Sequence, residues 1–310
     1  MFRTTAFAST HESERVADVT RNLTVVYETG SYPVCHEHAL VLHALNLPYE
    51  IIQLDGFYAL AVDSSLADEA RRQLALYEKE NRGWPPVLKQ LPRVSGGVVG
   101  AMCYMTLLLV LHWMSNAPAF GFDWYVEGRV DGRLMRAGEW FRAVTALMLH
   151  ADAAHLAGNA VIGAIFGMFL GQLIGQGFGW GLILAGGALG NIVNVLLQHP
   201  IHRAVGASTA VFAALGVLTA YTWMHRRDSR FHAAYRIAPL ISGAVLLAYL
   251  GTGDERTDIV AHLTGFAAGM GGGIIAAQLP QDWLHDDRRQ LIAGLVTPGV
   301  CLLAWMLAFA

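Results

Sequence analysis

The sequence predicts an all-α polytopic membrane protein that begins with a small soluble α/β domain. Only 15% of the 310 residues are charged, whereas 54% are apolar, and the mean hydropathy is +0.40. Soluble domains carry about 25% charged residues. The charge is also uneven, because 21 of the charged residues lie within residues 1–93. These observations exclude a wholly soluble enzyme, a disordered chain and a nucleic-acid binder with a basic face.

The N-terminal domain, residues 1–93, is predicted to fold as a β-α-β-β-α unit. A strand at Leu23–Tyr27 precedes a helix over Val34–Leu45, which has helical apolar spacing. The pair Asp55-Gly56 between two apolar runs predicts a hairpin, because both turn positions need positive φ. The pattern at Ser65–Asp68 resembles a capping box and predicts the start of a second helix.

The rest of the chain is predicted to cross the membrane seven times, because its uncharged stretches reach the length of about 20 residues that one helical span needs. The predicted spans are 96–115, 150–171, 178–198, 205–224, 237–253, 259–278 and 291–309. Residues 94–280 then form a six-span core, and residues 281–310 form a loop and the seventh span. The long connection at 116–142 is rich in Trp and charge, which predicts a position in the membrane interface.

The orientation of the spans follows from Lys and Arg near their ends. With the N-terminus inside, eight of these residues lie inside and six outside, which favours a cytoplasmic N-terminus. The first ten residues show no pattern of a removed signal peptide, so the first span is predicted to act as the targeting signal.

Polar residues stand near the start of three even-numbered spans: His155 and Asn159 in the second, Ser208 in the fourth and His262 in the sixth. Taken singly, a Gly-x-Ser pattern is more often a helix-packing surface, and a lone His often bonds a neighbouring helix. Even-numbered spans run in the same direction, however, and a rise of 1.5 Å per residue places His155, Ser208 and His262 within about 8 Å of one membrane face. Their shared depth favours one functional site.

The residue types in this site are those of acyl transfer. Ser208 is the candidate nucleophile and His262 the candidate general base. His155 and Asn159 lie four residues apart on one helix side, from which both can donate hydrogen bonds to an oxyanion. Asp258 precedes His262 by four residues; it either caps the helix, which is favoured, or reaches back to the imidazole. A Ser-His dyad is therefore expected.

Several separated motifs join these residues in one order. They are Glu139-Trp140-Phe141-Arg142, His150, His155-Leu-Ala-Gly-Asn159, Gly206-Ala-Ser208 and Ala261-His262-Leu-Thr-Gly265-Phe-Ala-Ala-Gly269. Over about residues 97–280, this pattern resembles the rhomboid intramembrane serine proteases. The resemblance implies that Ser208 is the nucleophile, that His262 is the base, and that His155 and Asn159 stabilise the oxyanion. It implies neither a cofactor nor a metal.

The resemblance also implies supporting roles for Gly206, Phe212, Gly265 and Gly269. The last two look like the small-xxx-small pair that lets the sixth span approach the fourth, and Phe212, a Tyr in some members, is expected to pack on His262. Thr209 stands where many members have Gly and is expected to crowd the oxyanion position. His150 is expected to brace the loop between the first two spans.

The chain is thus similar to the bacterial subclass with a cytoplasmic N-terminal domain, here with a seventh C-terminal span. This implies an intramembrane serine endopeptidase of the cell inner membrane, whose partners are transmembrane protein substrates and the lipid bilayer, with no nucleic acid. The alternative is a catalytically silent rhomboid-like protein that binds and escorts membrane clients.

Overall fold

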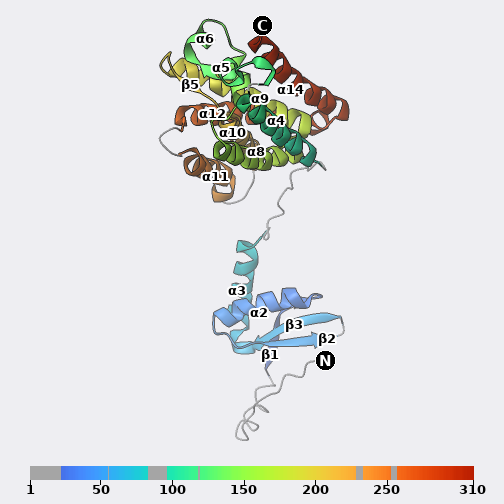
Figure 1. Ribbon diagram of the computed structural model, residues 1–310. Coiled ribbons are helices and arrows are strands. Elements are labelled where there is room, and N and C mark those ends of the chain that lie inside the picture. The colour runs from blue at the N-terminus through green and yellow to red at the C-terminus, as the bar shows by residue number, and fades with distance from the viewer. Residues whose placement is uncertain (1–21, 55, 83–95, 118, 228–232, 253–256) are drawn as a thin grey trace. The chain divides into compact units, whose positions relative to one another are not determined.

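The computed structural model describes residues 22–54, 56–82, 96–117, 119–227, 233–252 and 257–310. The chain divides into two compact units, Met1–Lys89 and Gln90–Ala310. Strands occur mainly in the first unit, and long helices make up most of the second (Figure 1).

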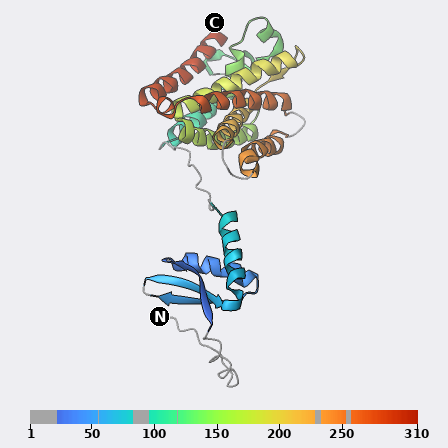
Figure 2. The same ribbon diagram turned by 180° about the vertical axis from the view of Figure 1, so that it is seen from behind.

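The first unit contains a three-stranded antiparallel sheet in the order β1-β3-β2, with two helices. Its elements are β1 (Leu23–Thr29), α2 (Tyr32–Ala44), β2 (Glu50–Leu54), β3 (Phe57–Asp63) and α3 (Ala67–Glu80). Leu54 pairs with Phe57, so β2 and β3 form the predicted hairpin, of which Asp55 lies outside the described residues. Apolar residues of the sheet and of both helices form one core. Figures 1 and 2 show the sheet and its two helices from opposite sides.

The start of α3 differs from the predicted capping box. Its N-cap is Leu66, which has no side-chain capping hydrogen bond. Asp63 instead accepts a hydrogen bond from the Ser65 N–H and begins a 3₁₀ turn ahead of the helix. The carboxylate at the strand end thus takes the Ser65 N–H group that Asp68 would bind in a capping box, and the Ser65 hydroxyl donates to the same carboxylate.

The second unit contains seven long helices close to the predicted spans. They are α4 (Val98–Asn116), α8 (Ala153–Ile174), α9 (Gln176–Leu197), α10 (Ser208–Arg226), α11 (Ala233–Gly251), α12 (Ile259–Gln278) and α14 (Asp287–Ala308). Within the described residues, six of them are long and apolar enough to cross a membrane, α10 being the exception. Most side chains of α10 are buried, because it packs against α8, α9, α11 and α12. The predicted polytopic membrane fold is confirmed.

The connection between α4 and α8 folds into short elements. They are α5 (Trp124–Gly128), β4 (Val130–Asp131), α6 (Gly132–Arg136), α7 (Arg142–Thr145) and a 3₁₀ turn at Ala146–Met148. Strand β4 pairs with β5 (Arg203–Ala204), which lies just ahead of α10. Arg142 is 4% exposed and donates hydrogen bonds to the Glu139 carboxylate and to the carbonyls of Val126 and Glu127. A buried guanidinium therefore holds this loop together.

Glycines allow α12 to lie directly on α10. A Cβ atom added at Gly265 would collide with the Thr209 carbonyl oxygen, and one at Gly269 would collide with that of Ala213. This agrees with the small-xxx-small spacing, which lets two helix backbones approach closely. The approach brings the first turn of α12 next to the first turn of α10.

Candidate active site

One cavity of about 960 Å³ is lined by the first turns of α8, α10 and α12. His155, Asn159, Ser208, Phe212 and His262 all lie in its wall. The five residues come from separate parts of the sequence, and the three helix starts bring them together. The predicted common depth of the polar residues therefore corresponds to a single cavity.

Helix starts position the residues on α8 and α10. Asp152 accepts a hydrogen bond from the His155 N–H at 2.8 Å, which fixes His155 in the first turn of α8. Gly206 has a φ of +141°, and a Cβ atom there would lie 2.7 Å from Cε1 of His155. Only glycine therefore suits this position. Ser208 is the first residue of α10, so its N–H group belongs to a helix N-terminus, where negative charge is favoured.

Asn159 supplies a donor to the same cavity. The residue is 8% exposed, and its Nδ2 atom has no hydrogen-bond partner within the described part of the chain. A buried amide without a partner is costly, at about 1–3 kcal/mol. An oxygen that carries negative charge would satisfy it, which is the chemistry expected of an oxyanion donor.

The imidazole of His262 is oriented by a backbone carbonyl. Its Nδ1 atom lies 2.9 Å from the carbonyl oxygen of Gly251, at the end of α11. That oxygen only accepts, so Nδ1 carries the proton and Nε2 remains an acceptor. The ring of Phe212 packs on the imidazole with ring centroids 4.4 Å apart. The sequence does not point to Gly251, because any residue can present a carbonyl group.

Asp258 caps α12, as predicted, but it does not bind His262. It accepts a hydrogen bond from the Ala261 N–H at 3.0 Å. Its other oxygen lies 2.8 Å from Nε2 of His202 and accepts from the Asn194 amide at 2.7 Å. Burial raises the pKa of Asp258, but these hydrogen bonds outweigh it and hold that pKa below its usual value. His202, to which the sequence assigns no role, lines the cavity with Asp258.

His150, which lies in the α4–α8 connection, holds that connection against the loop ahead of Ser208. Its ring is 2% exposed and accepts a hydrogen bond from the Ala207 N–H at 3.4 Å. Burial, followed by the neighbouring His155, lowers the pKa of His150 to about 3. The ring is therefore neutral near pH 7, as an accepting Nε2 requires.

Thr209 does not crowd the oxyanion position. The residue is 3% exposed and is absent from the wall of the cavity. Its methyl group points instead toward α9 and α12, where a Cβ atom added at Gly190 would lie 2.8 Å from it. A helix turns by 100° per residue, so a residue next to Ser208 faces a different neighbour.

Comparison with known proteins agrees with this arrangement. Residues 137–279 match the family model of the Rhomboid domain. Rhomboid-like protease 2 of Toxoplasma gondii is 28% identical over 163 residues, which is 50% of this chain and 51% of that protein. Putative rhomboid protease YdcA of Bacillus subtilis (strain 168) is 29% identical over 134 residues, which is 43% of this chain and 65% of that protein.

The matches therefore span about half to two thirds of the length of these relatives. The matched residues include the start of α8, α10 and α12, from which the cavity is built. Together with the helical membrane fold, they show a multi-pass membrane protein that matches the Rhomboid domain over residues 137–279.

Proposed function

We propose that the protein is an intramembrane serine endopeptidase that hydrolyses peptide bonds in or near transmembrane segments through a Ser208–His262 dyad. The observation that carries the proposal is the shared cavity, in which Ser208 and His262 line one wall with Asn159 and His155. Both relatives named above carry the word protease in their names. The N-terminal domain at 1–93 lies in the cytoplasm and the spans lie in the cell inner membrane in this proposal.

The proposed mechanism follows from the donor and acceptor roles of the side chains. Ser208 Oγ attacks the scissile carbonyl carbon, and Nε2 of His262 takes the hydroxyl proton, because its Nδ1 proton is bound by Gly251. The resulting oxyanion accepts hydrogen bonds from His155, the Asn159 amide and the Ser208 N–H. His262 then gives the proton to the leaving amine, and water hydrolyses the acyl-enzyme with His262 as base again.

A carbonyl oxygen takes the orienting position that a carboxylate holds in a Ser-His-Asp triad. The Gly251 carbonyl fixes the tautomer and the ring plane of His262, but it carries no full charge to stabilise the imidazolium. The charge of Asp258 acts on His262, but this carboxylate is already bound to His202 and Asn194. The site is therefore consistent with a dyad.

The test is cleavage of a model transmembrane substrate by the full chain in vesicles. We expect Ser208→Ala and His262→Ala each to lower kcat by about 10³-fold or more, because removal of one member of a catalytic unit lowers kcat by at least this factor. Ser242→Ala is the matched control, since Ser242 lies on the exposed side of α11 and should leave the rate unchanged.

A fluorophosphonate probe adds a second readout. Labelling of the wild type at Ser208 with loss of label in Ser208→Ala supports the proposal. Undiminished cleavage by the Ser208→Ala variant excludes Ser208 as the nucleophile. A folded wild type that neither labels nor cleaves supports the alternative of a catalytically silent protein that binds membrane clients.

A further inference from the structure

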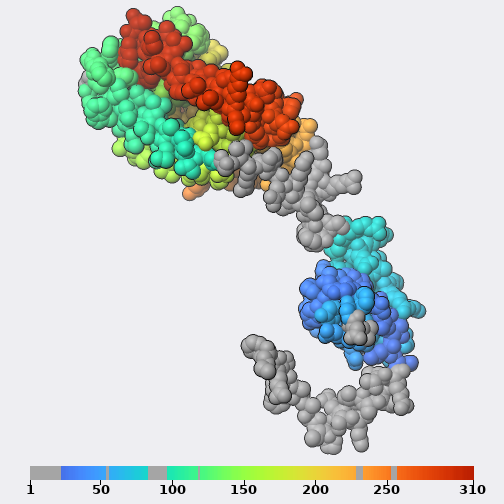
Figure 3. Space-filling model, turned by 90° about the vertical axis from the view of Figure 1, so that its right-hand side faces the viewer, coloured from blue at the N-terminus to red at the C-terminus, as the bar shows by residue number. Residues whose placement is uncertain are grey.

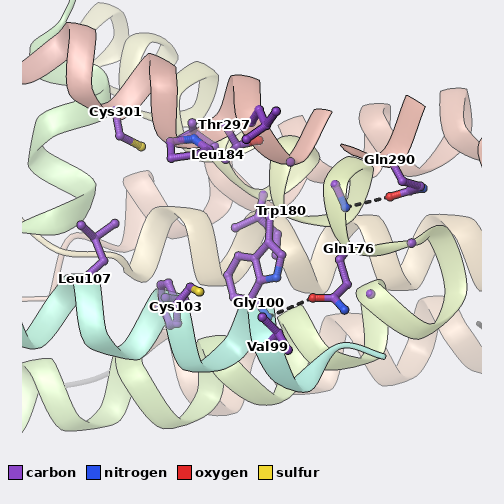
Figure 4. A pocket seen from close by; sticks show the side chains of 18 of the residues that line it. Val99, Gly100, Cys103, Leu107, Gln176, Trp180, Leu184, Gln290, Thr297 and Cys301 are labelled. Carbon is purple, nitrogen blue, oxygen red and sulfur yellow. Dashed lines mark hydrogen bonds between the residues drawn. The ribbon is translucent and has the colours of Figure 1, made fainter. Parts of the chain in front are cut away.

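A second cavity, of about 720 Å³, lies between α4, α9 and α14, away from His262 (Figure 4). Most of its wall is apolar, with Leu107, Ile183, Leu184 and Leu295 among the lining residues. Helices α4 and α14 both lie outside the matched residues 137–279. The catalytic proposal therefore makes no use of this cavity.

The cavity has the length of one bilayer leaflet. The apolar part of its wall on α14 runs from Leu291 to Cys301, a distance of about 15 Å at 1.5 Å per residue. The hydrocarbon core of a bilayer is about 30 Å thick, so one leaflet is about 15 Å. The wall on α4 runs from Val99 to Leu107, which is about 12 Å at the same rise.

The cavity opens sideways, between two helices that qualify as membrane spans. Val99, Leu291 and Leu295 line it and are each more than 60% exposed. Figure 3 shows a hollow between α14 (red) and α4 (blue-green), with yellow-green atoms at its bottom. In a membrane, this opening faces hydrocarbon chains.

One end of the cavity is polar. Gln176, His285, Asp287 and Gln290 line it there, at the starts of α4, α9 and α14. The Gln176 amide oxygen accepts from the Gly100 N–H, and that of Gln290 accepts from the Gly177 N–H (Figure 4). Two exposed arginines, Arg288 and Arg289, follow Asp287 and do not belong to the lining. The polar end, with these charged residues next to Asp287 in the sequence, thus corresponds to the headgroup level of the same leaflet.

The floor of the cavity is preformed. Trp180 of α9 fills notches in the two neighbouring helices, because a Cβ atom at Gly100 or at Gly167 would collide with its indole ring. Tyr104 stacks on it with ring centroids 5.0 Å apart. A rigid apolar wall keeps the cavity open, and a ligand that fills it loses little free energy to rearrangement of the protein.

We propose that this cavity binds one acyl chain of a membrane phospholipid, with the headgroup at the polar end beside Gln176, Gln290 and the two arginines. Each CH₂ group taken up by an apolar site contributes about 0.8 kcal/mol relative to water, but the surrounding bilayer is equally apolar. Selectivity for a bound lipid therefore comes from packing against the preformed wall. A transmembrane helix fits less well, since 15 Å of helix with a diameter of 10 Å occupies roughly 1,200 Å³.

The bound chain would contact the turn that carries Ser208. Ala207 and Ala210 line this cavity, whereas Ser208, Val211 and Phe212 line the candidate active site. The two cavities therefore touch different sides of one helical turn. The lipid proposal itself does not depend on catalysis.

The experiment measures phospholipid bound to the full chain by native mass spectrometry, after reconstitution with dioleoyl phosphatidylglycerol or dioleoyl phosphatidylcholine and extraction in mild detergent. The double variant Cys103→Phe/Cys301→Phe fills the cavity from both walls. The matched control is Met102→Phe/Leu302→Phe, whose residues are exposed neighbours outside the lining. We expect about one lipid per chain in the wild type and control, and about tenfold lower occupancy in the filled variant.

Equal lipid occupancy in the filled variant and the control overturns the proposal. It is also overturned if the filled variant changes oligomeric state or substrate cleavage while its lipid occupancy stays that of the wild type. A second measurement needs no variant. A phosphatidylcholine with a diazirine in its acyl chain should crosslink to Trp180 and Leu184 on the floor of the cavity in the wild-type protein. Crosslinks confined to outward residues such as Met102 and Leu302 also overturn it.

Discussion

At the scale of single residues, His150 predicts a dependence of stability on pH. Its pKa is about 3 in the fold and 6.5 for the ordinary side chain. Below pH 6.5 the unfolded chain therefore binds a proton that the folded chain refuses until about pH 3. The free energy of unfolding should fall by up to about 1.4 kcal/mol for each pH unit below 6.5.

The measurement is the unfolding midpoint of the full chain between pH 6.5 and 4.5. The fall of the midpoint with pH should be shallower in His150→Gln than in the wild type, because the variant lacks the imidazole that binds a proton in the unfolded chain but not in the folded one. His199→Gln is the control, since the His199 side chain is exposed. Equal slopes for His150→Gln and the wild type would show that burial of His150 does not set this dependence.

Sequence reasoning names the polar residues of the site but not the groups that orient them. His155, Asn159, Ser208 and His262 are found because polar side chains are rare in apolar spans. The Gly251 carbonyl contact with His262 is not found, because every residue has a carbonyl group and only the position of the α11 end selects this one. The pairing of Asp258 with His202 is missed for a similar reason, since it joins residues 56 positions apart in the sequence.

At the scale of helices, the contact between α10 and α12 predicts which glycine cannot change. Gly269→Ala should lower the free energy of unfolding by about 1–3 kcal/mol, because the new methyl group overpacks against the Ala213 carbonyl. Cleavage should fall with it, as His262 moves away from Ser208 together with the α12 backbone. Thermal unfolding and the cleavage assay measure the two effects.

Gly271→Ala is the matched control for this contact. Gly271 lies two residues along the same helix, and a Cβ atom there meets nothing within 4 Å. The control should change the free energy of unfolding by less than about 0.5 kcal/mol. A loss as large in Gly271→Ala as in Gly269→Ala would show that the contact with the Ala213 carbonyl does not set the effect.

Hydropathy predicts the helices well but not their ends or their depth in the fold. α12 covers the predicted residues 259–278, whereas α8 begins at Ala153 instead of residue 150, because Asp152 provides the N-cap. α10 is predicted as a span like the others, yet it is central and largely covered by protein. Burial by neighbouring helices cannot be distinguished from burial by lipid in composition alone.

At the scale of the whole membrane unit, Gln290 predicts how firmly α14 is attached. Its amide oxygen accepts from the Gly177 N–H, and its amide nitrogen donates to the carbonyls of Ile174 and Leu284. One side chain thus binds the turn between α8 and α9. Gln290→Leu should lower the free energy of unfolding by about 3 kcal/mol, because several partly buried backbone groups lose their partner.

Chemical or thermal unfolding of the full chain tests this prediction. Gln278→Leu is the control, since the amide nitrogen of the exposed Gln278 donates to the Ile274 carbonyl within its own helix. It should leave the midpoint nearly unchanged. A midpoint for Gln290→Leu that matches the control would mean that α14 is held by its apolar contacts alone.

The two-residue pairing of β4 with β5 has a consequence for protein engineering. Val130 pairs with Ala204 and Asp131 with Arg203, and the Asp131 carboxylate also binds the Arg203 guanidinium. The connection between the first two spans is thereby joined to the segment that leads into Ser208. A chimaera that exchanges this connection for that of a relative must therefore carry residues 199–206 from the same donor, because the two segments form one transplantable unit.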